Sequence, residues 1–129
     1  MQLSSSNDTS IDIRIATNYL RQQSTPENNE YVFSYTISIT NNGDAPAQLM
    51  SRRWIITDAN GDESYVEGEG VVGKQPLIGP GETHTYTSGS VFKTPIGTMH
   101  GQYQMKRLNG ETFWANIPVF RLSVPNILN

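Results

Sequence analysis

The 129-residue sequence contains no cysteine, which excludes disulfides, thiolate metal sites and thiol nucleophiles and suits a reducing compartment. No apolar run approaches the roughly 20 residues that a membrane-spanning helix needs, and the polar N-terminus lacks the pattern of a signal peptide. Nine Lys and Arg residues stand against twelve Asp and Glu, so the basic surface typical of nucleic-acid binding is missing. We therefore expect a cytoplasmic protein that inserts into no membrane and binds no nucleic acid.

Helical periodicity is also scarce, and the dominant pattern has a period of two residues. Between Tyr31 and Thr40, aromatic and isoleucine side chains alternate with a more polar set. Three isoleucines between Ile11 and Ile15 alternate with Asp12 and Arg14 in the same way. Successive side chains of a strand point to opposite faces, so both segments are predicted to be strands with one buried face.

Turn signals divide the rest of the chain. Asn-Gly pairs at Asn60-Gly61 and Asn109-Gly110 tolerate the positive φ values of a hairpin turn, and Gly79-Pro80-Gly81 marks another turn. The predicted strands lie near residues 11–19, 31–40, 47–58, 63–68, 82–91, 98–108 and 112–120. This rhythm predicts an all-β fold in which about seven antiparallel strands form a sandwich or barrel.

One domain is expected over residues 1–129, because this length suits a single core of ordinary size. Residues 1–9 and 125–129 are expected to be flexible ends, and residues 24–30 a polar loop. The alternation predicts a set of inward-facing side chains: Ile13, Phe33, Tyr35, Ile37, Trp54, Ile56, Tyr103, Met105, Phe113 and Ile117.

The segment from Gly68 to Gly73 matches the pattern G-x-G-x-x-G of dinucleotide-binding folds. In those folds a helix follows the glycines, whereas here Pro76 and Gly79-Pro80-Gly81 would end it. The favoured interpretation is a loop whose backbone needs glycine. The alternative is an anion-binding loop, in which Gly68, Gly70 and Gly73 expose amides beside Lys74.

Histidines and arginines supply the remaining candidates. His84 and His100 are far apart in sequence and form no H-x-H or H-x-x-x-H pair, so no metal site and no cofactor are expected. No G-x-S-x-G nucleophile motif occurs, and catalysis is not expected. Arg52 and Arg53 must point to opposite faces of one strand beside Trp54, and arginine next to aromatic residues is common in interfaces.

Five blocks of sequence resemble a known family. They lie at residues 53–61, 68–82, 86–89, 94–105 and 117–120, and their glycines and prolines follow the order seen in the ApaG family. The resemblance implies an immunoglobulin-like or fibronectin type III-like sandwich. Related domains are fused to an F-box protein and to a DNA-polymerase-delta-interacting protein, where they look like interaction modules. Bacterial members lie beside a diadenosine tetraphosphatase gene and have been labelled as associated with cobalt and magnesium efflux.

The leading hypothesis is a non-catalytic adaptor that binds another protein. One alternative is a binder of a nucleotide or dinucleoside polyphosphate at Gly68, Gly70, Gly73 and Lys74. Another, which follows from the resemblance, is a soluble factor associated with Co²⁺ or Mg²⁺ efflux. The sequence leaves open whether the protein is a monomer or a homodimer.

Overall fold

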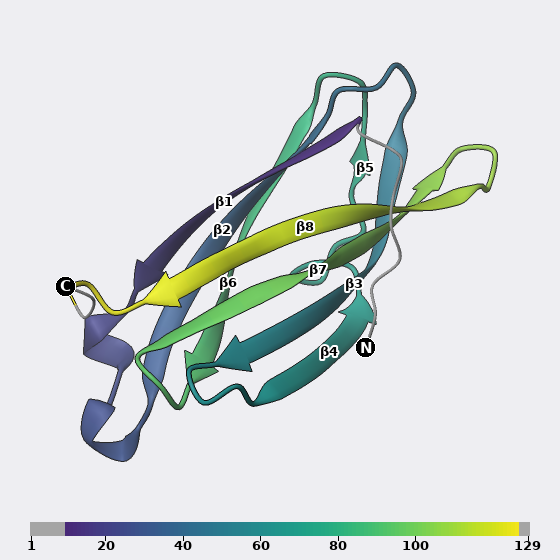
Figure 1. The fold of residues 1–129 in the computed structure, drawn as a ribbon. Coiled ribbons are helices and arrows are strands. Elements are labelled where there is room, and N and C mark those ends of the chain that lie inside the picture. The colour runs from purple at the N-terminus through teal and green to yellow at the C-terminus, as the bar shows by residue number, and fades with distance from the viewer. Residues whose placement is uncertain (1–9, 127–129) are drawn as a thin grey trace.

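Two antiparallel sheets pack face to face in the computed structural model, which describes residues 10–126 (Figure 1). The expected flexible end at residues 1–9, and residues 127–129 of the other, lie outside the described part. The strands are β1 (Ile11–Tyr19), β2 (Tyr31–Asn41), β3 (Ala47–Asp58), β4 (Glu63–Glu69), β5 (Leu77–Ile78), β6 (Thr83–Phe92), β7 (Ile96–Arg107) and β8 (Thr112–Ser123). The predicted all-β sandwich is confirmed.

The first sheet has the order β1-β2-β6, and the second has the order β4-β3-β7-β8, with β5 also pairing with β3. All seven predicted strands are present. The eighth, β5, is only two residues long, so it carries no alternation that sequence could reveal. It forms because its partners are fixed nearby: Ala47 and Gln48 of β3 pair with Ile78 and Leu77.

The predicted polar loop at residues 24–30 is more ordered than expected. It contains a single 3-10 turn, η2 (Pro26–Asn28), closed by a bridge between Thr25 and Glu30. A second turn, η1 (Arg21–Gln23), precedes it. Within residues 10–126 these two turns are the only helical elements, and no helix is long and apolar enough to cross a membrane.

The core lies between the sheets and matches most of the predicted inward positions. Seven of the ten are buried: Phe33, Tyr35, Ile37, Trp54, Tyr103, Met105 and Ile117. The other three, Ile13, Ile56 and Phe113, are partly buried and pack against this cluster. Buried residues outside the prediction include Leu49, Tyr86, Phe92, Met99 and Leu122.

Two register shifts explain why alternation fails along β3 and β8. One lies between Leu49 and Ser51 of β3, and the other lies where Met99 and Gly101 of β7 pair with Phe120 and Ile117 of β8. A bulge puts two residues of one strand opposite one of its partner and so resets which face the following side chains occupy. At Gly101, β7 approaches β3 so closely that any Cβ would overlap the main-chain carbonyl of Arg53, which accounts for the glycine.

Candidate functional site

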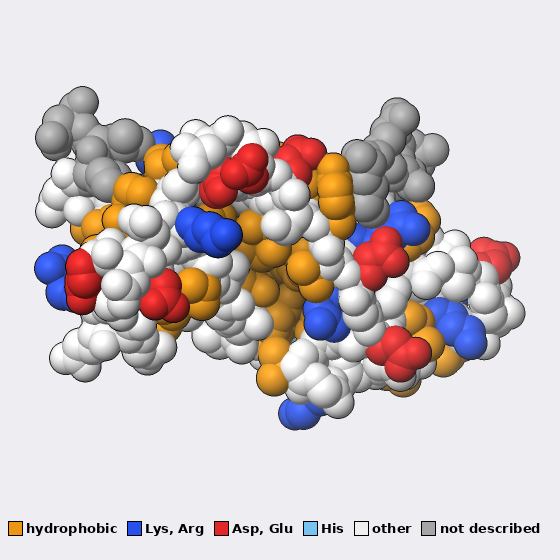
Figure 2. Space-filling model, turned by 90° about the horizontal axis from the view of Figure 1, so that it is seen from below, with side chains coloured by type: hydrophobic (Ala, Val, Ile, Leu, Met, Phe, Trp, Pro, Cys, Tyr) orange, Lys and Arg blue, Asp and Glu red, His pale blue; other side chains and the backbone are white. Residues whose placement is uncertain are grey.

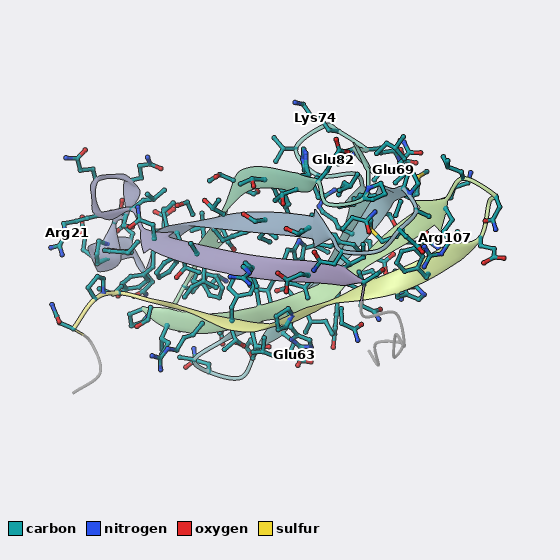
Figure 3. The ribbon with its side chains drawn as sticks, turned by 90° about the horizontal axis from the view of Figure 1, so that it is seen from above. Arg21, Glu63, Glu69, Lys74, Glu82 and Arg107 are labelled. Carbon is teal, nitrogen blue, oxygen red and sulfur yellow. The ribbon has the colours of Figure 1, made fainter. Side chains whose placement is uncertain are left out.

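The sandwich is closed along one side and open along the other. On the closed side β1 packs beside β8, as the view from above shows (Figure 3). On the opposite side the edges are β6 and β4, which have no comparable packing. Hydrophobic side chains lie at the bottom of a hollow on this side, with charged groups around it (Figure 2). We call the hollow between β6 and β4 the open groove.

Three cavities follow β6 along the open groove. The central one has a volume of about 350 Å³. A cavity of about 220 Å³ lies at the start of β6, against Leu77 and His84, and one of about 200 Å³ lies at its end, against Ile56 and Val91. The three cavities therefore follow β6 from its start to its end.

Aromatic side chains from both sheets form one wall of the central cavity. Tyr35 of β2 and Trp54 of β3 meet edge to face with ring centroids 5.6 Å apart. Tyr86 of β6 also lines the cavity, and its hydroxyl hydrogen-bonds the hydroxyl of Tyr103 on β7. Burial raises the pKa of both tyrosines, so both hydroxyls stay protonated well above the usual range.

The tyrosine pair was not predicted as a pair. Tyr103 was among the expected inward residues, but Tyr86 lies in a threonine- and serine-rich strand that reads as polar. The sequence contains one indication that Tyr86 faces inward. Tyr86 follows His84 by two residues, so the two side chains lie on the same face of the strand, opposite the threonines. Sequence alone does not show that β6 and β7 place the two hydroxyls opposite one another across the sheets.

Arg52 joins the aromatic wall to the glycine-rich loop. Its Nη1 donates hydrogen bonds to the main-chain oxygens of Glu69 at 3.1 Å and Gly70 at 2.9 Å. A Cβ on Gly68 would lie 2.7 Å from the same nitrogen, so glycine leaves the room that the guanidinium occupies. Arg52 has no carboxylate partner among the described residues, although Glu69 lines the same cavity.

Arg53 lies on the opposite, outer face of the sheet, as the alternation predicts. Its Nε lies 3.4 Å from a carboxylate oxygen of Glu67, and its guanidinium lies 4.2 Å from the ring centroid of Trp114. The structure therefore hydrogen-bonds Arg52 to the glycine-rich loop, whereas Arg53 lines a second cavity with Arg52 and Gly68 but does not line the central one. Of the two predicted interface arginines, Arg52 alone belongs to the open groove.

The glycine-rich loop is a tight hairpin. The amide of Val71 donates to the oxygen of Lys74, and the amide of Lys74 donates back to Val71, at 2.8 and 3.0 Å. The two residues at the tip, Val72 and Gly73, have φ values of 47° and 75°, as a type I′ turn requires. Gly70 has a φ of 63°, and a Cβ there would overlap the carbonyl of Lys74.

These contacts leave little of the loop for an anion. The amides of Gly70, Val71 and Lys74 already donate to main-chain oxygens, the first of them to Met50 at 2.9 Å. The side chain of Lys74 points outward from the loop (Figure 3). The loop positions Arg52 instead, because its carbonyls hold the guanidinium at the mouth of the central cavity.

The two histidines are not brought together, since His84 lies on β6 and His100 on β7, in different sheets. Within residues 10–126, no three His, Asp or Glu side chains are grouped so that they could hold a metal ion. Burial, and then the positive charge of Lys74, lower the pKa of His84. His84 therefore favours its neutral form at one end of the open groove.

Comparison with known proteins places these features in a family. The model of the ApaG domain family matches residues 21–107. Protein ApaG of Pseudomonas aeruginosa is 55% identical over 119 residues, covering 92% of this chain and 94% of that protein. Protein ApaG of Escherichia coli is 51% identical over 123 residues, covering 95% and 98%.

Solved structures agree with the fold. A crystal structure described as an ApaA protein from Bordetella pertussis is 47% identical, with a TM-score of 0.87 and coverage of 90% of this chain and 94% of that one. The X-ray structure of a structural genomics target is 51% identical, with a TM-score of 0.89 and coverage of 94% and 92%. The matched family region, residues 21–107, contains Arg52, the hairpin and β6.

Proposed function

This chain belongs to the ApaG family, and from that premise we propose that it is a non-catalytic adaptor that binds a segment of another protein in the open groove. The observation that carries the proposal is Arg52, a cation without a carboxylate partner, held beside Trp54 and two tyrosines at a cavity that opens to solvent. Tyr, Trp and Arg are the residues that most often dominate the energy of protein interfaces. We also propose the cytoplasm as its compartment, which the cysteine-free composition suits.

The groove is built on elements suited to recognition. Arg52 and Trp54 come from a central strand, and the hairpin that holds Arg52 is closed by its own hydrogen bonds. A site on rigid elements loses little conformational entropy when it binds, so more of the contact energy appears as affinity. This arrangement supports the adaptor expected from the sequence.

A phosphorylated small ligand is the second candidate, and one observation favours it. Arg52 presents guanidinium donors to the central cavity, and phosphate is a good partner for such a fork. The arrangement of the hairpin weighs against it, because three of its amides are committed to main-chain oxygens. We therefore rank this candidate below the protein partner.

Position-specific photo-crosslinking in cells tests the proposal. A benzophenone amino acid is placed at Val72 or Val91, which are exposed at the open groove, and at Val119, which is equally exposed on β8 away from it. We expect discrete crosslinked proteins from the two groove positions and none of the same bands from Val119. The same bands from all three positions would contradict a groove-specific partner.

Two neighbouring arginines provide the matched control. We expect Arg52→Gln to remove most of the groove crosslinks and Arg53→Gln to leave them, because only Arg52 faces the central cavity. Thermal unfolding followed by circular dichroism checks that both variants fold. Titration with ATP and with inorganic phosphate separates the second candidate, since saturable binding lost in Arg52→Gln would favour it over a protein partner.

A further inference from the structure

The long edge strands of this protein are protected to different degrees. An exposed edge presents unpaired main-chain groups, and natural sheets guard such edges with charges or proline. β1 carries Asp12 and Arg14, and β8 carries Pro118 and Arg121. β4 carries three glutamates in seven residues. The ten residues of β6, Thr83–Phe92, include no Asp, Glu, Lys, Arg or Pro at all.

The free edge of β6 faces the open groove with a defined set of main-chain groups. Asn41 donates its amide to the oxygen of Glu82, and Leu20 donates its amide to Val32. Hydrogen-bonded pairs alternate along antiparallel strands. These two bonds therefore show which residues of β2 and β6 are hydrogen-bonded to each other and which point the other way. Even-numbered residues of β6 bond to β2, and the amides and carbonyls of Thr85, Thr87 and Gly89 face away from it.

The cavities beside β6 fit the side chains of an added strand. Alternate residues of a strand lie roughly 6.6 Å apart on one face, so a segment pairing with β6 would direct every second side chain toward the groove. The central cavity offers the guanidinium of Arg52, which has no carboxylate partner, and the cavity at the end of β6 offers Ile56 and Val91. A carboxylate complements the first, and an apolar side chain complements the second.

The geometry points to strand addition: an extended segment of a partner protein pairs with the free edge of β6 and places an Asp, Glu or terminal carboxylate on Arg52. This inference rests on the proposed adaptor function and names its mode of binding. Main-chain hydrogen bonds supply affinity in such complexes, and the pockets for alternate side chains supply specificity. The partner segment is therefore acidic at one position, with apolar residues two or four positions away.

A phage-displayed library of random dodecapeptides supplies the probe, and an enriched peptide is then synthesised and titrated against the whole chain. The key variant is Thr87→Pro, which removes an outward-facing amide but no hydrogen bond to β2. Its matched control is Thr87→Val, because both variants lose the 2.8 Å hydroxyl contact with Thr36 and only the valine variant keeps the amide. We expect binding to weaken at least tenfold in the proline variant and less than twofold in the valine variant.

Two further measurements do not depend on the folding of a variant. Hydrogen exchange should slow at Thr85, Thr87 and Gly89 when the peptide binds, and not at outward-facing residues of β1. N-methylation along the peptide should abolish binding at alternate positions only. Replacing the peptide's acidic residue with its amide should weaken binding to the natural chain and not to Arg52→Gln.

Several results would overturn strand addition. One is peptide binding that is unchanged by Thr87→Pro and gives no protection on β6, which would leave an adaptor that uses another mode. A second is that no peptide is enriched on the natural chain relative to Thr87→Pro. A third is a dimer of the unliganded protein that Thr87→Pro dissociates, because the edge would then serve a second copy of this chain. Groove-specific crosslinks decide the adaptor function separately from all three.

Discussion

The two sides of the sandwich differ in how the edges of the two sheets meet. On the closed side β1 and β8 lie together. The isoleucines of β1 pack against the core, and Leu122 of β8 is fully buried in it. On the open side the sheets stay apart at β4 and β6, and an arginine, a hairpin and three cavities occupy the space. The same core therefore ends in apolar contact at one edge and in polar groups at the other.

The two sides differ in how much apolar surface lies between the sheet edges. Burying apolar surface stabilises a fold, and leaving cavities forgoes that gain. The open side also keeps Val72, a β-branched residue, at a φ of 47°. Strained backbone that persists beside a cavity is characteristic of functional sites. The asymmetry therefore supports the proposal that a partner binds in the open groove.

The largest expected effect tests the closed side. Leu122→Ala should lower the free energy of unfolding by about 2–5 kcal/mol, because it removes a fully buried side chain from a packed core. The matched change on the open side, Val91→Ala, should cost less than about 0.5 kcal/mol, since Val91 is exposed. Urea denaturation measures both. Similar losses from the two variants would break the comparison.

The tyrosine pair lies where the core meets the groove, and its effect should be intermediate. Tyr103→Phe should cost about 1–3 kcal/mol, because it leaves the buried hydroxyl of Tyr86 without its partner. The double variant Tyr86→Phe/Tyr103→Phe should lose less than the sum of the two single variants, since it removes both polar groups together. Urea denaturation of all four proteins completes the cycle, and strict additivity would show that the hydroxyls do not interact.

The same pair predicts a dependence on alkaline pH. Burial raises the pKa of both hydroxyls above their ordinary value of 10.0, so the unfolded chain releases these protons first. By linkage, their contribution to stability is present below pH 10 and is lost as the pH rises beyond it. Urea denaturation across this range should show a smaller alkaline loss in the double phenylalanine variant than in the natural chain. An equal loss in both would contradict the assignment.

The strands and most of the core were predictable from sequence, whereas the sheet order and the open groove were not. Alternation identifies β1 and β2 because one face of each strand packs against the core. The Asn-Gly pairs mark the turns from β3 to β4 and from β7 to β8. The same rule placed Arg52 and Arg53 on opposite faces, which the structure confirms. It fails where bulges reset the register, at Met50 of β3 and between Ile117 and Phe120 of β8.

Long-range placement accounts for what sequence missed in the groove. The glycine-rich loop and Arg52 were separate candidates, and only the pairing of β3 with β4 brings them into hydrogen-bonding contact. The freedom of the β6 edge depends on the strand order of the whole sheet, which no local pattern encodes. The missing charges on β6 were visible in the sequence, but they become informative only when β6 is known to be an edge.

The hairpin that holds Arg52 provides a smaller effect on the open side. Gly70→Ala should lower the free energy of unfolding by more than about 1 kcal/mol, because φ is positive there and the added Cβ meets the carbonyl of Lys74. Gly73→Asn is the control, since its Cβ position is open and asparagine tolerates a positive φ. Thermal unfolding compares the two. If Gly70→Ala is as stable as the control, the hairpin is less constrained than its hydrogen bonds indicate.

Val72 sharpens the comparison most directly, although its effect on stability is the smallest. Val72→Asn should raise the free energy of unfolding by up to about 1 kcal/mol, because asparagine adopts positive φ with less strain than a β-branched residue. Val91→Asn, at an equally exposed valine within a strand, should give no such gain. Urea denaturation measures stability, and crosslinking from Val91 in the Val72→Asn background measures partner binding. A variant that is more stable but captures less partner would show that the open side gives up stability for binding, whereas a gain in both would contradict that exchange.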